Sequence, residues 1–289
     1  MRETLLVDAP SLVYRAFFAL PKTLTDPSGR SINAARGFLD FTTRLITDRR
    51  PDRLVSVFDA NWRSEFRVAA YEGYKAQRPE DPIELPWQFD LIALILDAAG
   101  LVRAEAPGLE ADDALATLVQ DLDHDERAVI VSGDRDMLAL VRDPQVALIF
   151  PVTGMRNLKE FDAAAVEEKT GVPPELYQEF AMMRGDSSDG LPGVAGIGPV
   201  RAAKLLTDYG SIAGILNHLD ELPPKQAAAF RDSIDYLTAM RTVVPMVTDA
   251  PIEITEPHEP EYAELERLTE EHNLGSSGNR LIQVLKGER

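Results

Sequence analysis

The sequence contains no cysteine, and only four histidines are scattered through its 289 residues. Disulfides and thiolate metal sites are therefore excluded, and a histidine-rich zinc site has no ligands to draw on. Any metal ion that this chain binds must be held by oxygen atoms.

Long apolar runs and positive charge are also scarce. No run of about 18 apolar residues occurs, and no basic segment precedes an apolar one as in a secretory signal. We therefore expect a cytoplasmic protein that does not contact a membrane. Basic residues number 30 against 48 acidic ones, which gives a net charge of −18. A net negative charge argues against sequence-independent binding of nucleic acid, unless basic residues are concentrated locally on one surface.

Four short apolar runs rich in β-branched residues predict buried strands, with amphipathic helical patterns between them. They lie at residues 4–9, 53–60, 127–136 and 145–152. Strands that alternate with helices predict a parallel α/β sheet. The first three runs each end in aspartate, namely Asp8, Asp59, and Asp134 with Asp136. Because ligands bind beyond the carboxyl ends of such strands, these acids are candidate site residues.

A third group of acids opens a predicted helix in "GLEADDAL", residues 108–115. Turn chemistry and the helix dipole account for any one of these acids alone. However, Glu110 and Asp113 share a helix face, with Asp112 about a quarter-turn away, so the three repel one another unless a cation lies between them. Together with the acids at three strand ends, this cluster favours a cation site.

The strand signal fades after about residue 155, and the remainder is predicted to be helical. Within it, "GVAGIGPVRAAKLL", residues 193–206, fits a helix-hairpin-helix turn, in which glycines let the backbone approach a DNA phosphate. The last forty residues are rich in proline and glutamate and end in one predicted amphipathic helix, to which we assign no chemistry.

Six blocks of sequence, in order, resemble the 5′ nucleases, the family of flap endonucleases and 5′→3′ exonucleases that includes the N-terminal nuclease domain of bacterial DNA polymerase I. The blocks are "LLVDAPSLVYRAFFALP", "SVFDANWRSEFR", "YEGYKAQRP", "GLEADDALATL", "SGDRDMLALV" and "RGDSSDGLPGVAGIG". The resemblance implies a PIN-like α/β core at residues 1–183 with a helical gateway at about 60–90. It also implies an all-helical DNA-binding region at 184–289, with the helix-hairpin-helix at about 185–210.

The resemblance also assigns ligands to two divalent cations, Mg²⁺ or Mn²⁺, that hydrolyse a phosphodiester. For the first metal it implies Asp8, Asp59, Glu110, Asp112 and Asp113. For the second it implies Asp134, Asp136, Asp186 and Asp189. A monovalent cation, K⁺ in particular, would be held in the hairpin by the backbone carbonyls of Val194 and Ile197.

Basic and aromatic residues receive DNA-directed roles from the same resemblance. Lys75 and Arg78 match the gateway pair that reaches the scissile phosphate. They are three residues apart, so on a helix their side chains would be neighbours. DNA binding is implied for Arg67, Tyr74, Gly196, Gly198, Arg201 and Lys204. The alternatives are a solvated helix face for Lys75 and Arg78, a core position for Tyr74 and a structural salt bridge for Arg67.

Four features depart from the family pattern. Ala9 follows the first aspartate where the family has glycine, which should leave Asp8 in place. Gly190 replaces a common asparagine and predicts a looser loop. Val200 replaces a usual lysine, so the hairpin's phosphate contact is expected to be weaker. The gateway stretch at residues 79–87 is acidic and rich in proline, which predicts a less cationic or less helical segment.

The function implied is a structure-specific 5′ nuclease that acts on DNA flaps, gaps, nicks or 5′ ends, including RNA-primed ones, in replication and repair. It would act as a monomer beside a DNA polymerase supplied in trans. Two alternatives stay open: a catalytically silent protein that binds DNA junctions, and a PIN-like ribonuclease.

Overall fold

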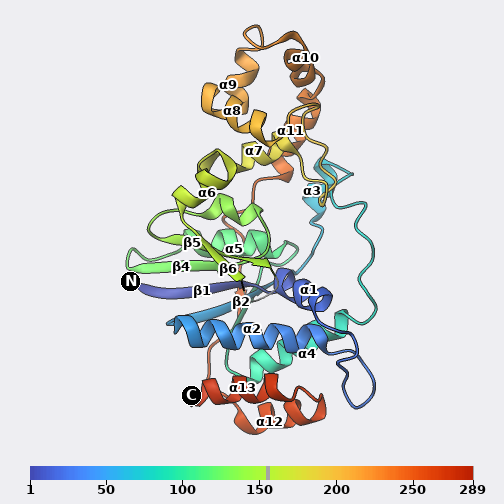
Figure 1. Cartoon of the computed structure of the whole chain (residues 1–289), viewed down its shortest axis with the longest axis vertical. Coiled ribbons are helices and arrows are strands. Elements are labelled where there is room, and N and C mark those ends of the chain that lie inside the picture. Colours follow the sequence, from blue (N-terminus) through green and yellow to red (C-terminus); the bar gives the residue numbers. More distant parts are fainter. Residues whose placement is uncertain (154–156, 289) are drawn as a thin grey trace.

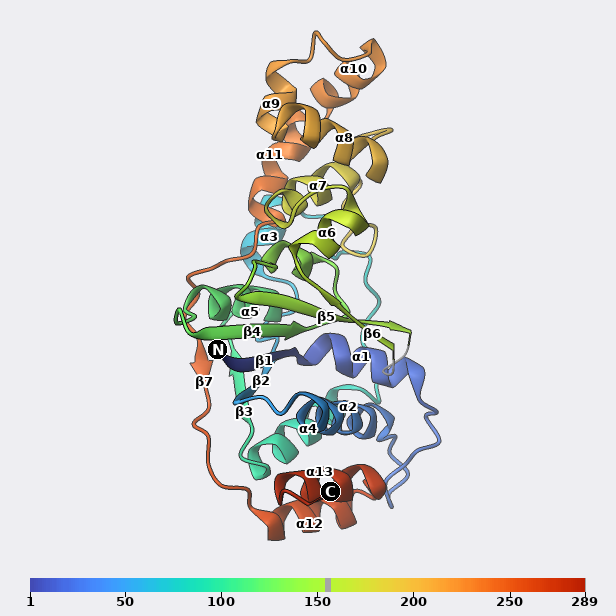
Figure 2. The same cartoon turned by 60° about the vertical axis from the view of Figure 1, so that its left-hand side comes forward.

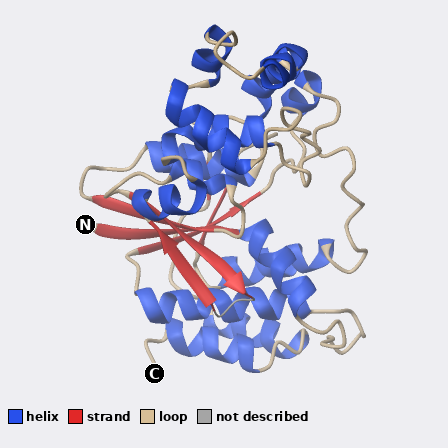
Figure 3. Cartoon of the chain, turned by 45° about the horizontal axis from the view of Figure 1, so that its top comes forward, coloured by secondary structure: helices blue, strands red, loops and turns tan. Residues whose placement is uncertain are grey.

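A twisted sheet crosses the middle of the molecule, with helices on both of its faces and a helical extension at one end. This computed structural model describes residues 1–153 and 157–288. Figure 1 shows α8, α9 and α10 at one end of the long axis and α12 and α13 at the other, and Figure 3 shows the helices on both sides of the sheet.

The strands form one mixed sheet in the order β6-β5-β4-β1-β2-β3-β7. Their bounds are β1 (Arg2–Asp8), β2 (Arg53–Phe58), β3 (Val102–Glu105), β4 (Glu126–Val131), β5 (Val146–Thr153), β6 (Asn157–Phe161) and β7 (Glu253–Ile254). The neighbours from β5 to β3 pair in parallel, whereas β6 and β7 pair antiparallel at the two edges. The parallel α/β core expected from the sequence is therefore confirmed.

Three strands were not predicted, and each lacks a strong apolar signal. β3 is four residues long and alternates buried and half-buried positions, β6 is mostly exposed, and β7 contains two exposed residues. The expectation that no strand follows about residue 155 is thus wrong. Short edge strands need only backbone pairing, which leaves little trace in the side-chain pattern.

The helices complete two layers around the sheet. Their bounds are α1 (Ala9–Ala19), α2 (Asn33–Arg49), α3 (Glu65–Ala70), α4 (Pro86–Ala98), α5 (Ala111–Gln120), α6 (Ala163–Thr170), α7 (Tyr177–Arg184), α8 (Pro199–Tyr209), α9 (Ile212–Asn217), α10 (Pro224–Asp232), α11 (Ile234–Val243), α12 (Tyr262–Glu271) and α13 (Ser276–Leu285), with 3₁₀ turns η1 (Asp136–Leu140) and η2 (Pro174–Leu176).

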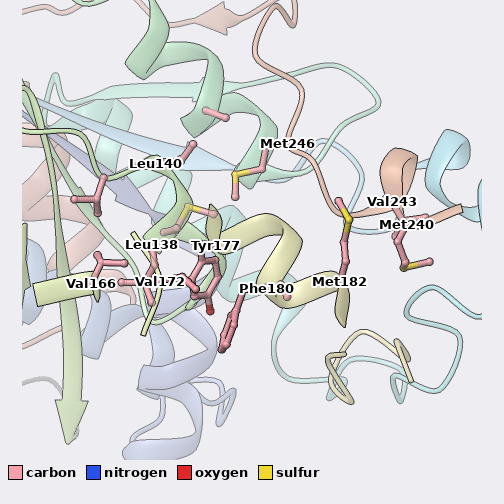
Figure 4. Close-up of a cluster of buried hydrophobic side chains, with 14 of the residues drawn as sticks. Leu138, Leu140, Val166, Val172, Tyr177, Phe180, Met182, Met240, Val243 and Met246 are labelled. Atoms are coloured by element: carbon pink, nitrogen blue, oxygen red, sulfur yellow. The ribbon is translucent and has the colours of Figure 1, made fainter. Parts of the chain in front are cut away.

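The two faces of the sheet bury separate apolar clusters. One cluster joins α1, α2, α4, α12 and α13 to the sheet. The other begins under α5 and continues without a break into α7, α8 and α11. Figure 4 shows this continuation, in which Tyr177, Phe180 and Met182 of α7 lie between the sheet side and Met240 and Val243 of α11. The helical extension is therefore packed onto the core by apolar contacts.

The C-terminal residues return to the sheet after the helical extension. Figure 2 shows the chain passing from α11 along β7 to α12 and α13. β7 pairs with β3, and the two terminal helices contact α2 and α4. The sequence predicted one helix here, whereas the structure has two, separated by Asn273 with a positive φ of 51°.

The expected helical gateway is only partly helical. α3 ends at Ala70, and residues 71–85, which we call the strap, form turns and extended chain before α4 begins. Lys75 has a φ of 53°. Lys75 and Arg78 are therefore not neighbours on a helix, which corrects the spacing argument. Pro79 and Pro82 explain why the second half of the strap is not helical, because proline removes backbone donors and disfavours helix at the residue before it.

Among the described residues, no helix combines the length and the apolar character needed to cross a membrane.

Packing between α1 and α2 leaves no room beside Gly37. A Cβ atom there would lie 2.7 Å from the Ala16 Cβ atom and 2.8 Å from Leu20 Cδ1. Gly37→Ala should therefore lower the free energy of unfolding by about 1–2 kcal/mol in urea titration, since overpacking outweighs the gain in helix propensity. Asp40→Ala, on the more exposed side of α2, is the control. Equal midpoints for the two variants would contradict the close approach.

Candidate active site

Acids from three adjacent strands meet at the carboxyl edge of the sheet. Asp8 ends β1, Asp59 follows β2, and Asp134 follows β4, and these strands are neighbours in the order β4-β1-β2. The convergence predicted from the strand ends is therefore present. Parallel strands force it, because their carboxyl ends all lie on one edge.

Asp8 is held by two neighbouring elements. Its carboxylate caps α1, accepting a bond of 3.1 Å from the backbone N–H of Ser11, and it also accepts a bond from the Ser132 hydroxyl. Burial raises the pKa of Asp8 to about 7, with Asp134 and Asp59 adding to the rise and the two serine bonds opposing it. The carboxylate is thus placed accurately in an environment that disfavours its charge.

The first turn of α5 supplies the next acids. The backbone N–H of Ala111 donates to Asp59 Oδ1 at 2.7 Å, which fastens the helix start to the end of β2. Burial raises the pKa of Asp112, and repulsion from Asp134 and Asp8 raises it further. Asp112 therefore faces the acids at the strand ends.

The loop after α7 brings the remaining acids to the same edge. Asp186 accepts bonds from the backbone of Ser188 at 2.8 Å and from its hydroxyl. Burial raises the pKa of Asp136, and Asp134, Asp189 and Asp186 all add to the rise. The fold thus brings the acids after β4 and those in the loop after α7 close together.

Three cavities border these carboxylates. One, of about 960 Å³, is bordered by Asp134 and Asp186. Of the two that border Glu110 and Asp112, the larger has a volume of about 890 Å³ and lies between α1 and the strap, and the other is much smaller. The larger cavity is bordered by Asp8, Asp59, Glu110, Asp112 and Asp134. The smaller is bordered by Glu110, Asp112, Asp136, Asp186 and Asp189. Glu110 and Asp112 therefore lie between two groups of acids.

Two strap cations point into the acid cluster. Lys75 Nζ lies 2.5 Å from Glu110 Oε2 and is 7% exposed as a residue. Burial opposes its charge, but Glu110, Asp189 and Asp112 outweigh that effect and raise the pKa of Lys75. Arg78 Nη2 lies 2.7 Å from Asp189 Oδ1. Neither cation therefore lies on a helix face: Lys75 is buried, and Arg78 is partly exposed but paired with Asp189.

Arg67 and Asp113 form a buried pair that corrects two sequence-based expectations. The guanidinium donates to both carboxylate oxygens of Asp113, at 2.7 and 2.6 Å, and Arg67 is 3% exposed. Asp113 also accepts the backbone N–H of Val247 at 2.8 Å and borders none of these cavities. Arg67 has no surface to offer DNA, and Asp113 is engaged as a structural acid.

Tyr74 is also buried, at 4% exposure, and its hydroxyl donates to Glu110 Oε2 at 2.8 Å. This position corrects the expectation that Tyr74 stacks on a base. Its role here is to orient the carboxylate of Glu110, as Lys75 does.

The donor chemistry fits hard divalent cations. In the described part of the chain, no ion pair neutralises Asp8, Asp59, Asp112, Asp134 or Asp136. Oxygen-only ligands of this kind suit Mg²⁺ or Mn²⁺. Within residues 1–153 and 157–288, however, no three acidic or histidine side chains lie close enough, as placed, to enclose a metal ion.

The loop with the last acids is tighter than its sequence predicted. Gly190 has a φ of 74°, and a Cβ atom there would lie 2.4 Å from the carbonyl oxygen of Gly73. The expected loosening by Gly190 is therefore corrected, because glycine permits close contact with the strap. The backbone N–H of Lys75 donates to the carbonyl of Asp189 at 2.9 Å across this contact.

The predicted hairpin lies between α7 and α8. Gly196 has a φ of 74°, Gly198 caps α8, and neither has other atoms near its missing side chain. Arg201 donates to the carbonyl of Gly196 at 2.7 Å, and Lys204 is exposed. Val194 and Ile197 bury their side chains and thereby fix the loop backbone. Val200, in contrast, is 85% exposed.

Several residues at the site were not identified from the sequence. Ser132 orients Asp8, and Tyr14 bonds to Asp81 of the strap. Ser132 lies inside the predicted strand run 127–136, two residues before Asp134, and this spacing was a usable signal. The Tyr14 contact joins segments 67 residues apart and had no local signal.

Two family profiles match the chain. One, described as "5'-3' exonuclease, N-terminal resolvase-like domain", covers residues 3–171, and the other, "5'-3' exonuclease, C-terminal SAM fold", covers 172–267. A 5'-3' exonuclease of Streptomyces coelicolor is 40% identical over 97% of this chain and 99% of its own length. A DNA polymerase I of Mycobacterium bovis is 37% identical over 86% of this chain, which corresponds to 27% of the polymerase.

Solved structures share the fold. The T5 D15 protein co-crystallized with metal ions superposes with a TM-score of 0.68 at 20% identity, over 99% of both chains. Human GEN1 in complex with Holliday junction DNA gives a TM-score of 0.62 at 15% identity, over 98% of this chain and 71% of GEN1. At 15–20% sequence identity, this similarity shows a shared fold.

The Arg67–Asp113 pair leads to a stability prediction. Asp113→Ala should lower the free energy of unfolding by about 3–5 kcal/mol, because the buried guanidinium loses its bidentate partner and keeps only Glu110, at 3.3 Å, as a counter-charge. Asp48→Ala, which removes the partially exposed pair with Arg44, should cost less than about 1 kcal/mol. Urea unfolding monitored by circular dichroism measures both. Similar small losses would indicate that the buried pair is not structural.

Proposed function

Because this chain belongs to the 5'-3' exonuclease family, we propose that it is a structure-specific 5′ nuclease. It hydrolyses phosphodiesters of DNA that carries a 5′ flap, gap, nick or 5′ end, RNA-primed ends included. The proposal draws on one observation above all: acids from three adjacent strands, α5 and the loop after α7 converge beside the buried Lys75 and the partly exposed Arg78.

The carboxylates Asp8, Asp59, Glu110, Asp112, Asp134, Asp136, Asp186 and Asp189 would hold two divalent cations. Such ions, when bound, activate water and stabilise the attacking and leaving oxygens of a phosphodiester. The protein contributes rigid placement: Ser132 and the start of α1 hold Asp8, and the backbone of Ala111 holds Asp59. Asp113 is left out of the set, because Arg67 and Val247 occupy its oxygens.

Lys75 and Arg78 would act on the scissile phosphate. Both border the cavity between α1 and the strap, beside the acids, and both are now paired with carboxylates that the proposal assigns to the cations. Cations in the site would compete for Glu110 and Asp189 and free the two side chains toward a phosphate. Charge gathers on that phosphate as it is attacked, so they would favour the transition state.

The hairpin would hold duplex phosphates away from the chemistry. Gly196 and Gly198 leave the backbone open to approach, and Arg201 and Lys204 supply charge on the same turn and helix. The carbonyls of Val194 and Ile197 are the candidate ligands for K⁺. Val200 offers no charge, so the contact rests on the backbone and Arg201.

The proposal extends to the setting of the enzyme. It would act as a monomer on chromosomal DNA in the cytoplasm, after a DNA polymerase acting in trans has produced the flap or gap. We also propose a functional division near residues 183/184, with six of the eight carboxylates before it and duplex binding by the hairpin after it. Asp186 and Asp189, from the second part, complete the acid site. The terminal helices α12 and α13 belong spatially to the first part, since they contact α2 and α4.

Cleavage of a 5′-labelled flap substrate with Mn²⁺ tests the function. Asp112→Asn should reduce single-turnover cleavage at least 100-fold while binding of the flap persists, because electrostatic terms at such centres are large. Asp121→Asn, at the exposed end of the same helix, is the control. Cleavage should stop in excess chelator. Undiminished cleavage in chelator, or near-normal turnover by Asp112→Asn, would refute the assignment.

Kinetic and binding measurements should distinguish the basic side chains of the strap from those of the hairpin. Arg78→Ala is expected to lower the saturated single-turnover rate about 10- to 100-fold with little change in affinity, and Lys75→Met likewise. Arg201→Ala should instead weaken binding about 3- to 10-fold and reduce the slope of log K against log salt by about 0.9. If Arg78→Ala weakened only binding, the strap would be an electrostatic track without a role in catalysis.

A further inference from the structure

The exposed stripe of α1 runs along the acid-bordered cavity. Leu12, Val13, Ala16 and Phe17 of this helix are buried in the core, while the positions between them face the cavity. Ser11, Arg15 and Phe18, spaced by four and three residues, lie on one side of the helix. The stripe begins at Ser11, beside Asp8, and ends roughly 10 Å farther along at Phe18.

Phe18 is a large apolar side chain that the fold leaves in water. It is 73% exposed, although its ring packs edge-on against the buried ring of Phe17 at 5.3 Å. Apart from this contact, most of the Phe18 side chain is open to solvent. Phe18 and Ala19 are the exposed apolar residues of α1, and the large ring of Phe18 borders the cavity, which makes it a candidate binding position.

Trp62 is a second exposed ring on the same cavity. It lies in the loop between β2 and α3, is 49% exposed, and its carbonyl accepts a bond of 3.2 Å from Lys75 Nζ. The residue that carries the indole ring is therefore tied to the buried cation of the site. Phe18 lies on α1 and Trp62 in the loop between β2 and α3, so the fold brings the two rings to the same cavity.

We propose that Phe18 and Trp62 form a base-stacking surface for the unpaired 5′ arm of the DNA substrate. This inference deepens the proposed function and rests on it. Aromatic side chains stack on any base and so hold single strands without reading sequence. A base inside a duplex has both faces covered by its neighbours, whereas an unpaired base can leave its strand to stack on a ring. The two rings would therefore select an unpaired arm.

The charges along the stripe agree with a nucleic-acid strand as the occupant. Arg15 lies between the acids and Phe18, and among the described residues it has no hydrogen bond or ion pair. Its guanidinium lies beside Gly133, a residue that borders the same cavity. An apolar peptide would leave this charge unmatched, whereas a phosphate between two stacked bases would neutralise it.

The test compares two flap substrates that differ only in their 5′ arms. One arm carries normal bases, and the other has abasic sites in the nucleotides nearest the junction. Binding is measured by fluorescence anisotropy in Ca²⁺, a hard cation that takes oxygen ligands. We expect the normal arm to bind wild-type protein about 5- to 30-fold more tightly than the abasic arm. Phe18→Ala and Trp62→Ala should each lose most of this preference, and both arms should then bind like the abasic arm.

Four further variants make the result specific to stacking. Phe18→Tyr should keep the preference, while Phe18→Leu, apolar but not flat, should lose it. Leu94→Ala removes an exposed apolar side chain of α4 outside the cavity and should change nothing. With Trp87→Phe, Trp62 remains the single tryptophan of the chain, and its fluorescence should fall with the normal arm only.

Equal binding of the two arms by wild-type protein, or a normal preference in Phe18→Ala and Trp62→Ala together, would overturn the stacking proposal. The Mn²⁺ cleavage assay separates this failure from a failure of the proposed function. Efficient flap cleavage without any arm preference would leave the nuclease proposal standing and remove the stacking surface alone.

Discussion

Repulsion among buried carboxylates is the constraint on which the rest of this structure depends. Parallel strands deliver acids to one edge of the sheet, and burial there disfavours their charge, as the raised pKa values of Asp8, Asp112 and Asp136 indicate. Basic side chains form ion pairs with three other acids: Arg67 with Asp113, Lys75 with Glu110 and Arg78 with Asp189. The acids at the strand ends are left for other cations.

These ion pairs also determine how the strap is held. Residues 71–85 form little regular structure, and polar contacts fix them: Lys75 and Gln77 bond to the loop after α7, while Asp81 bonds to Tyr14. Contacts of this kind can be exchanged for contacts with a charged ligand at modest cost, whereas an apolar core cannot. The segment that crosses the acid cluster is therefore the part of the fold best suited to respond to metal ions and DNA.

The helical extension, in contrast to the strap, is held by apolar packing. The cluster under α5 continues into α7, α8 and α11, and the buried side chains of Val194 and Ile197 fix the hairpin loop to it. At the other end, α12 and α13 return to α2 and α4. The hairpin and the acid cluster are thus parts of one packed body, which would keep the proposed phosphate contact and the proposed cleavage site at a constant separation.

The sequence by itself determined the parallel sheet, the acids at its carboxyl edge and the glycine turn between α7 and α8, because strand periodicity, helix starts and glycine turns are local properties. Only the tertiary structure decided which acids share a space. It removed Asp113, Arg67 and Tyr74 from the surface, left the strap without a helix, and brought Phe18 to the same cavity as Trp62. Burial and ion pairing join residues far apart in the chain, and no local pattern records such contacts.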